Sequence, residues 1–197
     1  MEIENHKEEV PFEHYRELFL KADAREMAER TGAKWDGETF TVNLLGTEYA
    51  ISHPAYGITP NCVLPMQTFL LRYLLEGKAV SWDGGWKTFR EMPWGELYIK
   101  PYTGRVLTRA AFTFGTRVAA FASACEKMGA TKLSHGDAGY EFAFLGGYKM
   151  RIMVWAGDDE FPPNAQVLYS DNFETGFQPE DRVVAGDILI SVIKANM

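Results

Sequence analysis

Two stretches of the chain decide its fold, because each shows the same succession of local signals. Residues 24–52 read AREMAERTGAKWDGETFTVNLLGTEYAIS, and residues 121–153 read FASACEKMGATKLSHGDAGYEFAFLGGYKMRIM. Each begins with a helical pattern that ends in Gly-Ala, at Gly32 and Gly129, then passes through a polar turn into alternating apolar residues and a Leu-Gly turn. We interpret the two stretches as copies of one structural unit.

The similarity continues beyond the hairpins. Pro65 precedes the apolar segment MQTFLLRYLLEGK, and Pro179 precedes EDRVVAGDILISVIKAN. Proline in the first turn of a helix loses no intrahelical hydrogen bond and presets the helical φ angle, so both segments are predicted to be helices. The expected unit is therefore a helix, a hairpin, a short third strand and a second helix.

These signals predict an α+β fold in which helices pack on an antiparallel sheet. We expect one globular domain over residues 1–197, built from pseudo-repeats at about 11–78 and 109–197 that a bridge at 79–108 connects. A single hairpin leaves an apolar face that it cannot cover alone, and pairing of the two copies would bury it. The alternative is that two helix-and-hairpin patterns resemble each other by chance.

Apolar spacing predicts where the longer helices lie. Residues from Phe12 to Arg30 follow helical spacing, and Gly32 is a suitable C-terminal stop. Residues from Ala110 to Met128 are predicted to form one long helix.

Composition excludes several classes of protein. The chain has 197 residues, 46% hydrophobic, and a formal net charge of −7, which is typical of a folded protein and argues against a surface built to neutralise nucleic-acid phosphates. Cys62 and Cys125 are far apart and belong to no metal-ligand spacing. Met1 to Val10 is acidic and polar, with no secretory-signal pattern, and no apolar run is long enough to span a membrane. We therefore expect a cytoplasmic protein.

A family resemblance rests on two segments. They are FREMPWGELYIKPYTGRVL at 89–107, which leads into a helix near Phe112, and GDDEFPPNAQVLYSDNF at 157–173. Together they resemble the DUF3786 family of prokaryotic, mostly anaerobic proteins, over nearly the whole chain. The resemblance implies no reaction and no catalytic residues. Some relatives carry iron–sulfur segments, which this sequence lacks, and this association points towards anaerobic cofactor metabolism, including corrinoid-dependent systems.

The bridge is unusually rich in aromatic rings, with arginines and glycines between them. Aromatic faces stack on flat ligands and guanidinium groups hold carboxylate or phosphate, so the bridge suits the wall of a ligand site. A lid over the seam between the two halves would need the same residues and no ligand. The predicted cofactor-binding residues of the bridge are Trp82, Trp86, Arg90, Trp94, Tyr98 and Arg105.

His53 and Tyr56 follow the second strand of the first copy, where the second copy has the loop Gly157 to Pro163. An imidazole at this position suits an axial ligand to the cobalt or iron of a tetrapyrrole, or an acid–base role near neutral pH. The alternative is a histidine that only makes a hydrogen bond within its loop.

The densest polar cluster is Asp158, Asp159 and Glu160, next to Pro162-Pro163. Grouped carboxylates can hold a divalent cation or supply a general base, and we identify them as candidate metal ligands. The spacing is not that of a calcium loop, and a solvated loop explains the cluster equally well.

From these residues we expect a non-enzymatic protein that binds a bulky small molecule, such as a corrinoid, haem or another tetrapyrrole. The alternatives are a metal-assisted hydrolase or lyase that uses the acidic cluster with His53, and a protein-interaction subunit. Whether the chain catalyses a reaction is left open. No nucleic-acid or membrane partner is expected.

Overall fold

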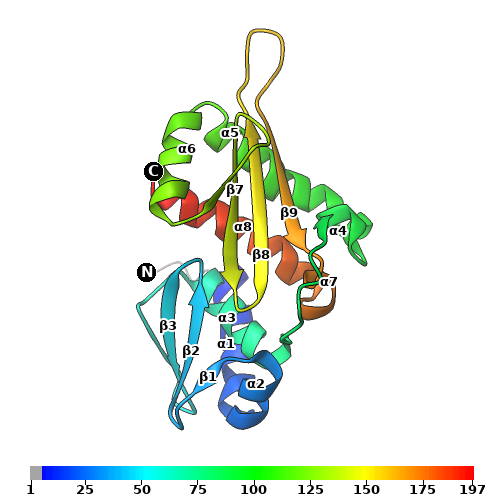
Figure 1. The fold of residues 1–197 in the computed structure, drawn as a ribbon. Helices are drawn as coiled ribbons and strands as arrows, with labels where there is room; N and C mark the ends of the chain where they lie inside the picture. Colours follow the sequence, from blue (N-terminus) through cyan, green and yellow to red (C-terminus); the bar gives the residue numbers. More distant parts are fainter. Residues whose placement is uncertain (1–5) are drawn as a thin grey trace. The chain divides into compact units, whose positions relative to one another are not determined.

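A computed structural model describes residues 6–197 (Figure 1). The chain divides into two units, unit 1 up to Ala79 and unit 2 from Val80 to Met197. The predicted bridge at 79–108 thus falls almost wholly within unit 2. The acidic start from Met1 to Val10, on which the expectation of no secretory signal rests, lies partly outside the described residues.

Unit 1 is built from helices and short antiparallel strands, in which β1 pairs with β2, β2 with β3, and β3 with β4. Its elements are α1 (His6–Lys21), α2 (Ala24–Thr31), β1 (Lys34–Trp35), β2 (Thr39–Leu44), β3 (Thr47–Ser52), β4 (Gly57–Thr59) and α3 (Leu64–Glu76).

The helical stretch predicted from Phe12 to Arg30 forms two helices, because the helical conformation is interrupted at Ala22 and Asp23. Asp23 is the N-cap of α2, and its carboxylate accepts hydrogen bonds from the backbone N–H groups of Arg25 and Glu26. At the other end the predicted stop at Gly32 is confirmed, with a left-handed φ of 69° that favours glycine.

Unit 2 contains strands that pair antiparallel in the order β6, β7, β8, β9, β5. Its elements are β5 (Trp86–Thr88), the 3-10 helix η1 (Phe89–Glu91), α4 (Gly95–Tyr102), the π-helix η2 (Thr103–Thr108), α5 (Arg109–Phe114), α6 (Val118–Lys127), β6 (Thr131–Leu133), β7 (Ala138–Leu145), β8 (Tyr148–Trp155), β9 (Asn164–Ser170), α7 (Phe173–Gly176) and α8 (Pro179–Ala195).

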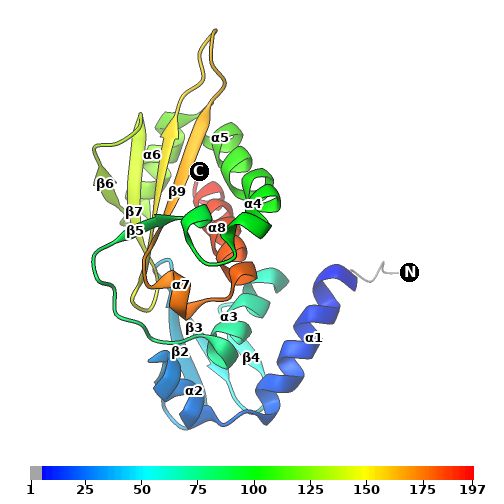
Figure 2. The ribbon, with the colours of Figure 1, turned by 90° about the vertical axis from the view of Figure 1, so that its right-hand side faces the viewer.

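Side chains along β7, β8 and β9 alternate between the two faces of this sheet. Helices α5, α6 and α8 lie on one side of the strands (Figures 1 and 2). The strand residues on that side form the core of the unit and are almost completely buried: Tyr140, Phe142, Phe144, Met150, Ile152, Val154, Val167 and Tyr169. The predicted α+β class, with helices on an antiparallel sheet, is confirmed.

The prediction of one long helix from Ala110 to Met128 is wrong, because the helical conformation ends with α5 and resumes at α6. The break is at Gly115. A side chain there would collide with Pro163 and with the carbonyl oxygen of Trp155, so only glycine allows the helix end to approach the β8–β9 hairpin this closely.

Part of unit 2 follows the same order of elements as unit 1. A helix, a short strand, a hairpin, a further strand and a proline-initiated helix occur as α2-β1-β2-β3-β4-α3 and as α6-β6-β7-β8-β9-α8, with α7 inserted before the last helix. In unit 1, Phe40 of β2 lies opposite Ile51 of β3. In unit 2, Tyr140 of β7 lies opposite Ile152 of β8.

Candidate functional site

The face of the unit 2 sheet that points away from α5, α6 and α8 carries charged side chains. Glu141 of β7 lies directly opposite Arg151 of β8, and the next outward position of β8 is Lys149. Arg151 Nε donates a hydrogen bond of 2.9 Å to Glu141 Oε2, and Lys149 Nζ donates one of 3.2 Å to Oε1. One carboxylate therefore joins two cations.

Two tryptophans of the bridge complete this cluster. Trp86 of β5 and Trp82 of the preceding loop meet edge to face, with ring centroids 5.4 Å apart. The Lys149 ammonium lies 4.3 Å from the centre of the Trp82 ring, and the Arg151 guanidinium lies 3.9 Å from the centre of the Trp86 ring. Both separations are within the range of cation–π attraction. We call Trp82, Trp86, Glu141, Lys149 and Arg151 the tryptophan–cation cluster.

The cluster remains partly open to solvent. The exposed fraction of the side chain is 16% for Glu141, 28% for Arg151 and 36% for Lys149. Partial burial alone would raise the pKa of Glu141, but hydrogen bonds from Arg151 and Lys149, together with their charges, outweigh it and lower that pKa. With Glu141 ionised, the two cations leave the cluster with one positive charge in excess, in a chain whose formal net charge is −7.

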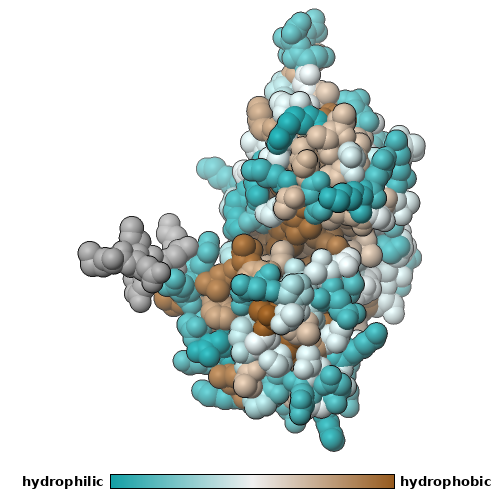
Figure 3. Space-filling model, turned by 90° about the vertical axis from the view of Figure 1, so that its left-hand side faces the viewer, coloured by the Kyte–Doolittle hydropathy of each residue, from teal (hydrophilic) through white to brown (hydrophobic). Residues whose placement is uncertain are grey.

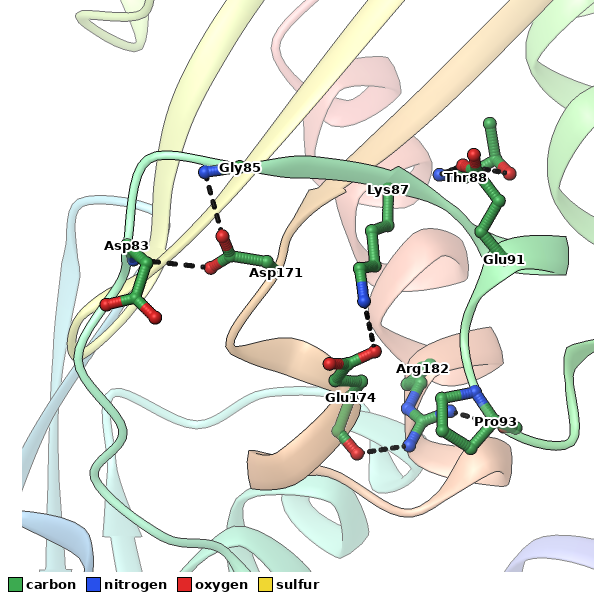
Figure 4. A network of polar contacts seen from close by, with 9 residues as sticks. All are labelled: Asp83, Gly85, Lys87, Thr88, Glu91, Pro93, Asp171, Glu174 and Arg182. Atoms are coloured by element: carbon green, nitrogen blue, oxygen red, sulfur yellow. Dashed lines mark hydrogen bonds and ion pairs between the residues drawn. The ribbon is translucent and has the colours of Figure 1, made fainter.

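The loop that carries Trp82 is tied to the end of β9 at several points (Figure 4). The carboxylate of Asp171 accepts hydrogen bonds from the backbone N–H groups of Gly85, at 2.8 Å, and Asp83, at 3.4 Å. Asn172 Nδ2 donates to the carbonyl oxygen of Val80, at 2.8 Å. A side chain at residue 85 would collide with the Asp171 carboxylate. These contacts fix the loop that presents Trp82.

A second polar network holds the bridge against α7 and α8 (Figure 4). Lys87 Nζ donates a hydrogen bond of 2.5 Å to Glu174, on the helix-covered side of the sheet. Arg182 is buried and donates to the carbonyl oxygens of Pro93, Glu174 and Phe177. Since these acceptors are all backbone groups, Arg182 orders the chain rather than offering a charge to a ligand.

The remaining predicted bridge residues do not join the tryptophan–cation cluster. They lie around α4, on the side of the sheet that α8 covers (Figure 2). Arg90 pairs with Glu96, the Tyr98 hydroxyl donates to Glu180, and Arg105 pairs with Asp187 of α8. Trp94 is 67% exposed at the start of α4. The bridge thus presents its rings in two separate groups.

His53 and Tyr56 belong to an aromatic group within unit 1. His53 Nε2 lies 3.0 Å from the carbonyl oxygen of Phe19, and since a carbonyl only accepts, Nε2 carries the proton of this hydrogen bond. The His53 ring also meets the ring of Phe19 edge to face. The Tyr56 hydroxyl donates to Gln67 Oε1 at 2.7 Å, and burial raises the pKa of Tyr56 strongly. These contacts suit a packing role, and the role of His53 as an axial ligand stays a prediction.

The acidic cluster lies at the tip of the long β8–β9 hairpin, which is hydrophilic in Figure 3. Asp158 accepts hydrogen bonds from the backbone N–H groups of Glu160 and Phe161, and these bonds lower its pKa. Its carboxylate thus closes the turn of its own loop. Among residues 6–197 no three His, Cys, Asp or Glu side chains are placed to share a metal ion. Metal binding by Asp158, Asp159 and Glu160 stays a prediction.

The two cysteines are unsuited to nucleophilic chemistry. Burial raises the pKa of the Cys62 thiol to about 11 and that of Cys125 to about 12. A thiol that stays protonated at neutral pH is a poor nucleophile.

Sequence reasoning found both tryptophans of the cluster but missed Glu141, Lys149 and Arg151. A signal was present: in the segment 148–152, charged residues alternate with large hydrophobic or aromatic ones, which places Lys149 and Arg151 on the face opposite the core. What the alternation could not provide was the pairing of β5 with β9, which brings Trp86 beside these cations.

Comparison with known proteins agrees with the sequence resemblance. The family model described as a domain of unknown function, DUF3786, matches residues 23–192. The chain therefore belongs to the DUF3786 family. No curated protein and no solved structure matches it. Within the described part of the chain, none of the helices combines the length and apolar character that crossing a membrane requires.

Proposed function

We propose that this chain is a non-enzymatic binding protein that holds a flat ligand with polar edges on the tryptophan–cation cluster. The observation that supports it is the partly exposed pair of tryptophans, in which Lys149 lies over the ring of Trp82 and Arg151 over the ring of Trp86. Indole rings and guanidinium planes both stack on flat rings, and the cations offer partners to acidic groups at the ligand's edge. A corrinoid or haem, the ligands suggested by the sequence, has this shape.

We also infer that the units arose by internal duplication. The support is the shared order of elements and the antiparallel hairpin in each unit, together with the left-handed glycines Gly32 and Gly129 after the first helix of each copy. In this interpretation the two copies share a scaffold, and unit 2 alone acquired the tryptophan–cation cluster.

Titration of the purified protein with haem and with cobalamin tests the proposed function. Saturable binding with a shift of the absorption spectrum is expected for at least one of the two. Trp86→Leu and Arg151→Gln are expected to weaken it severalfold, while Arg105→Gln, which removes a paired arginine on the α8 side, leaves it unchanged. If the protein binds neither haem nor cobalamin, the proposal is wrong. The metal-assisted reaction and the protein-interaction role would then be tested next.

His53→Ala addresses the axial ligand separately. An altered spectrum of the bound haem or cobalamin would support the axial role of the imidazole in unit 1 and would contradict binding on the tryptophan–cation cluster of unit 2. An unchanged spectrum would exclude that role and leave the tryptophan–cation cluster in place.

A further inference from the structure

Glu141 shows which chemical group Lys149 and Arg151 bind. Its carboxylate uses both oxygens, one towards Lys149 and one towards Arg151, and Arg151 approaches Oε2 through both Nε and Nη2, at 2.9 and 2.8 Å. These hydrogen bonds are stronger than those between neutral groups, because donors and acceptor are all charged. The positions of Lys149 and Arg151 are therefore complementary to a carboxylate.

From this geometry we infer that the ligand carries free carboxylates rather than amides at its edge, and that a ligand carboxylate competes with Glu141 for Lys149 and Arg151. The inference rests on the proposed function, because it names the ligand class of the same surface. Exchange of one carboxylate for another preserves the charge-assisted hydrogen bonds. A neutral amide in the same place would leave part of the cationic charge uncompensated.

In this arrangement Glu141 is an internal competitor. While it occupies both cations, only one excess positive charge attracts an acidic ligand. Glu141→Gln keeps the shape of the side chain, removes its charge and leaves both cations to the ligand. Affinity for an acidic ring is therefore expected to rise about fivefold, which corresponds to the modest free energy of a partly exposed ion pair.

Glu174→Gln is the matched control. It removes one negative charge from the same unit, so the net charge of the chain changes equally, but its partner is Lys87 on the other side of the sheet. Long-range attraction affects both variants alike. A gain confined to Glu141→Gln thus reports the local competition.

The test compares two flat probes of opposite charge, tetra(carboxyphenyl)porphyrin and tetra(N-methylpyridyl)porphyrin, by absorption titration of wild-type protein and both variants. The net charge of −7 favours the cationic ring over the surface as a whole, so tighter binding of the carboxylate ring must come from a local site. The expected result is preference for the carboxylate ring, a gain of about fivefold in Glu141→Gln, and none in Glu174→Gln.

The outcomes separate the two proposals. If wild-type protein binds neither porphyrin, haem nor cobalamin, the proposed function fails. If it binds a flat ring but prefers the cationic one, or binds the carboxylate ring with the same affinity in Glu141→Gln, the inference about carboxylates is overturned and the proposed function stands. Should Glu141→Gln fold poorly, Glu141→Thr, the residue at the equivalent strand position of unit 1, replaces it.

Discussion

Units 1 and 2 each contain an antiparallel hairpin, and that of unit 2 has a register shift between Ala143 and Leu145 that the hairpin of unit 1 lacks. The two hairpins also differ in the residues on one face. The position after Phe40 in β2 is Thr41, which lies opposite Ala50. The position after Tyr140 in β7 is Glu141, which lies opposite Arg151. One hairpin thus carries two small, uncharged residues at these positions, and the other carries an ion pair beneath tryptophan. The candidate site therefore depends on the particular side chains of the unit 2 hairpin, because an antiparallel hairpin does not by itself require them.

The inner face of each hairpin shows the opposite trend. Phe40 and Ile51 are completely buried in unit 1, as Tyr140 and Ile152 are in unit 2. A buried cross-strand pair of large apolar side chains therefore lies in the core of each unit. The comparison separates positions that stabilise the fold from positions that distinguish the units.

The largest expected effects are at these core positions. Ile51→Ala and Ile152→Ala should each lower the free energy of unfolding by about 2–5 kcal/mol, because each removes buried methyl groups and leaves a cavity. Urea unfolding monitored by circular dichroism measures both. A cost below about 1 kcal/mol at either position would show that the two isoleucines do not play equivalent roles.

An intermediate effect is expected at the contact that orders the Trp82 loop. Asp171→Ala leaves the N–H groups of Asp83 and Gly85 without their carboxylate partner and should cost about 1–3 kcal/mol. It should also weaken haem binding severalfold, because Trp82 is no longer held beside Lys149. Asp158→Ala removes an equal charge from the exposed hairpin tip and should leave binding unchanged. Equal binding by both variants would contradict the link between Asp171 and the site.

The smallest effect is a pH dependence of stability. The pKa of Glu141 is lowered in the folded chain, so its stabilising contribution is complete above the unfolded value of about 4.3 and is lost as the pH falls through the lower folded value. The difference in unfolding free energy between wild-type protein and Glu141→Gln should therefore be constant from pH 7 to about 5 and shrink below about 4. A difference that grows on acidification would contradict the assignment. The measurement is urea unfolding of wild-type protein and Glu141→Gln at these pH values.

The sequence predicted the hairpins because alternation of apolar residues is a local property. Residues 140–144 and 149–154 are strands as expected. The bridge was harder to interpret, since its glycines and prolines, such as Pro101, do not indicate the helices that follow β5. Tertiary packing outweighs the low helical preference of these residues. Tyr102, at the end of α4, stacks on Phe89 with ring centroids 4.1 Å apart.

The candidate site could be predicted only in part for the same reason. The aromatic content of the bridge identified Trp82 and Trp86, but it also suggested Trp94 and Tyr98, which lie at the start of α4 and within it. Which rings share a surface depends on the pairing of β5 with β9 and on the helical course of α4. Both are long-range features that composition does not contain.

The most direct test of the ligand surface is nuclear magnetic resonance of the tryptophan indole N–H signals during titration with ferric haem, whose unpaired electrons broaden nearby signals. The signals are assigned with single Trp→Phe variants. Binding at the tryptophan–cation cluster predicts that the Trp82 and Trp86 signals broaden first, while that of Trp94 stays sharp. Early broadening of Trp94, with Trp82 and Trp86 unaffected, would place the ligand elsewhere and contradict the proposal.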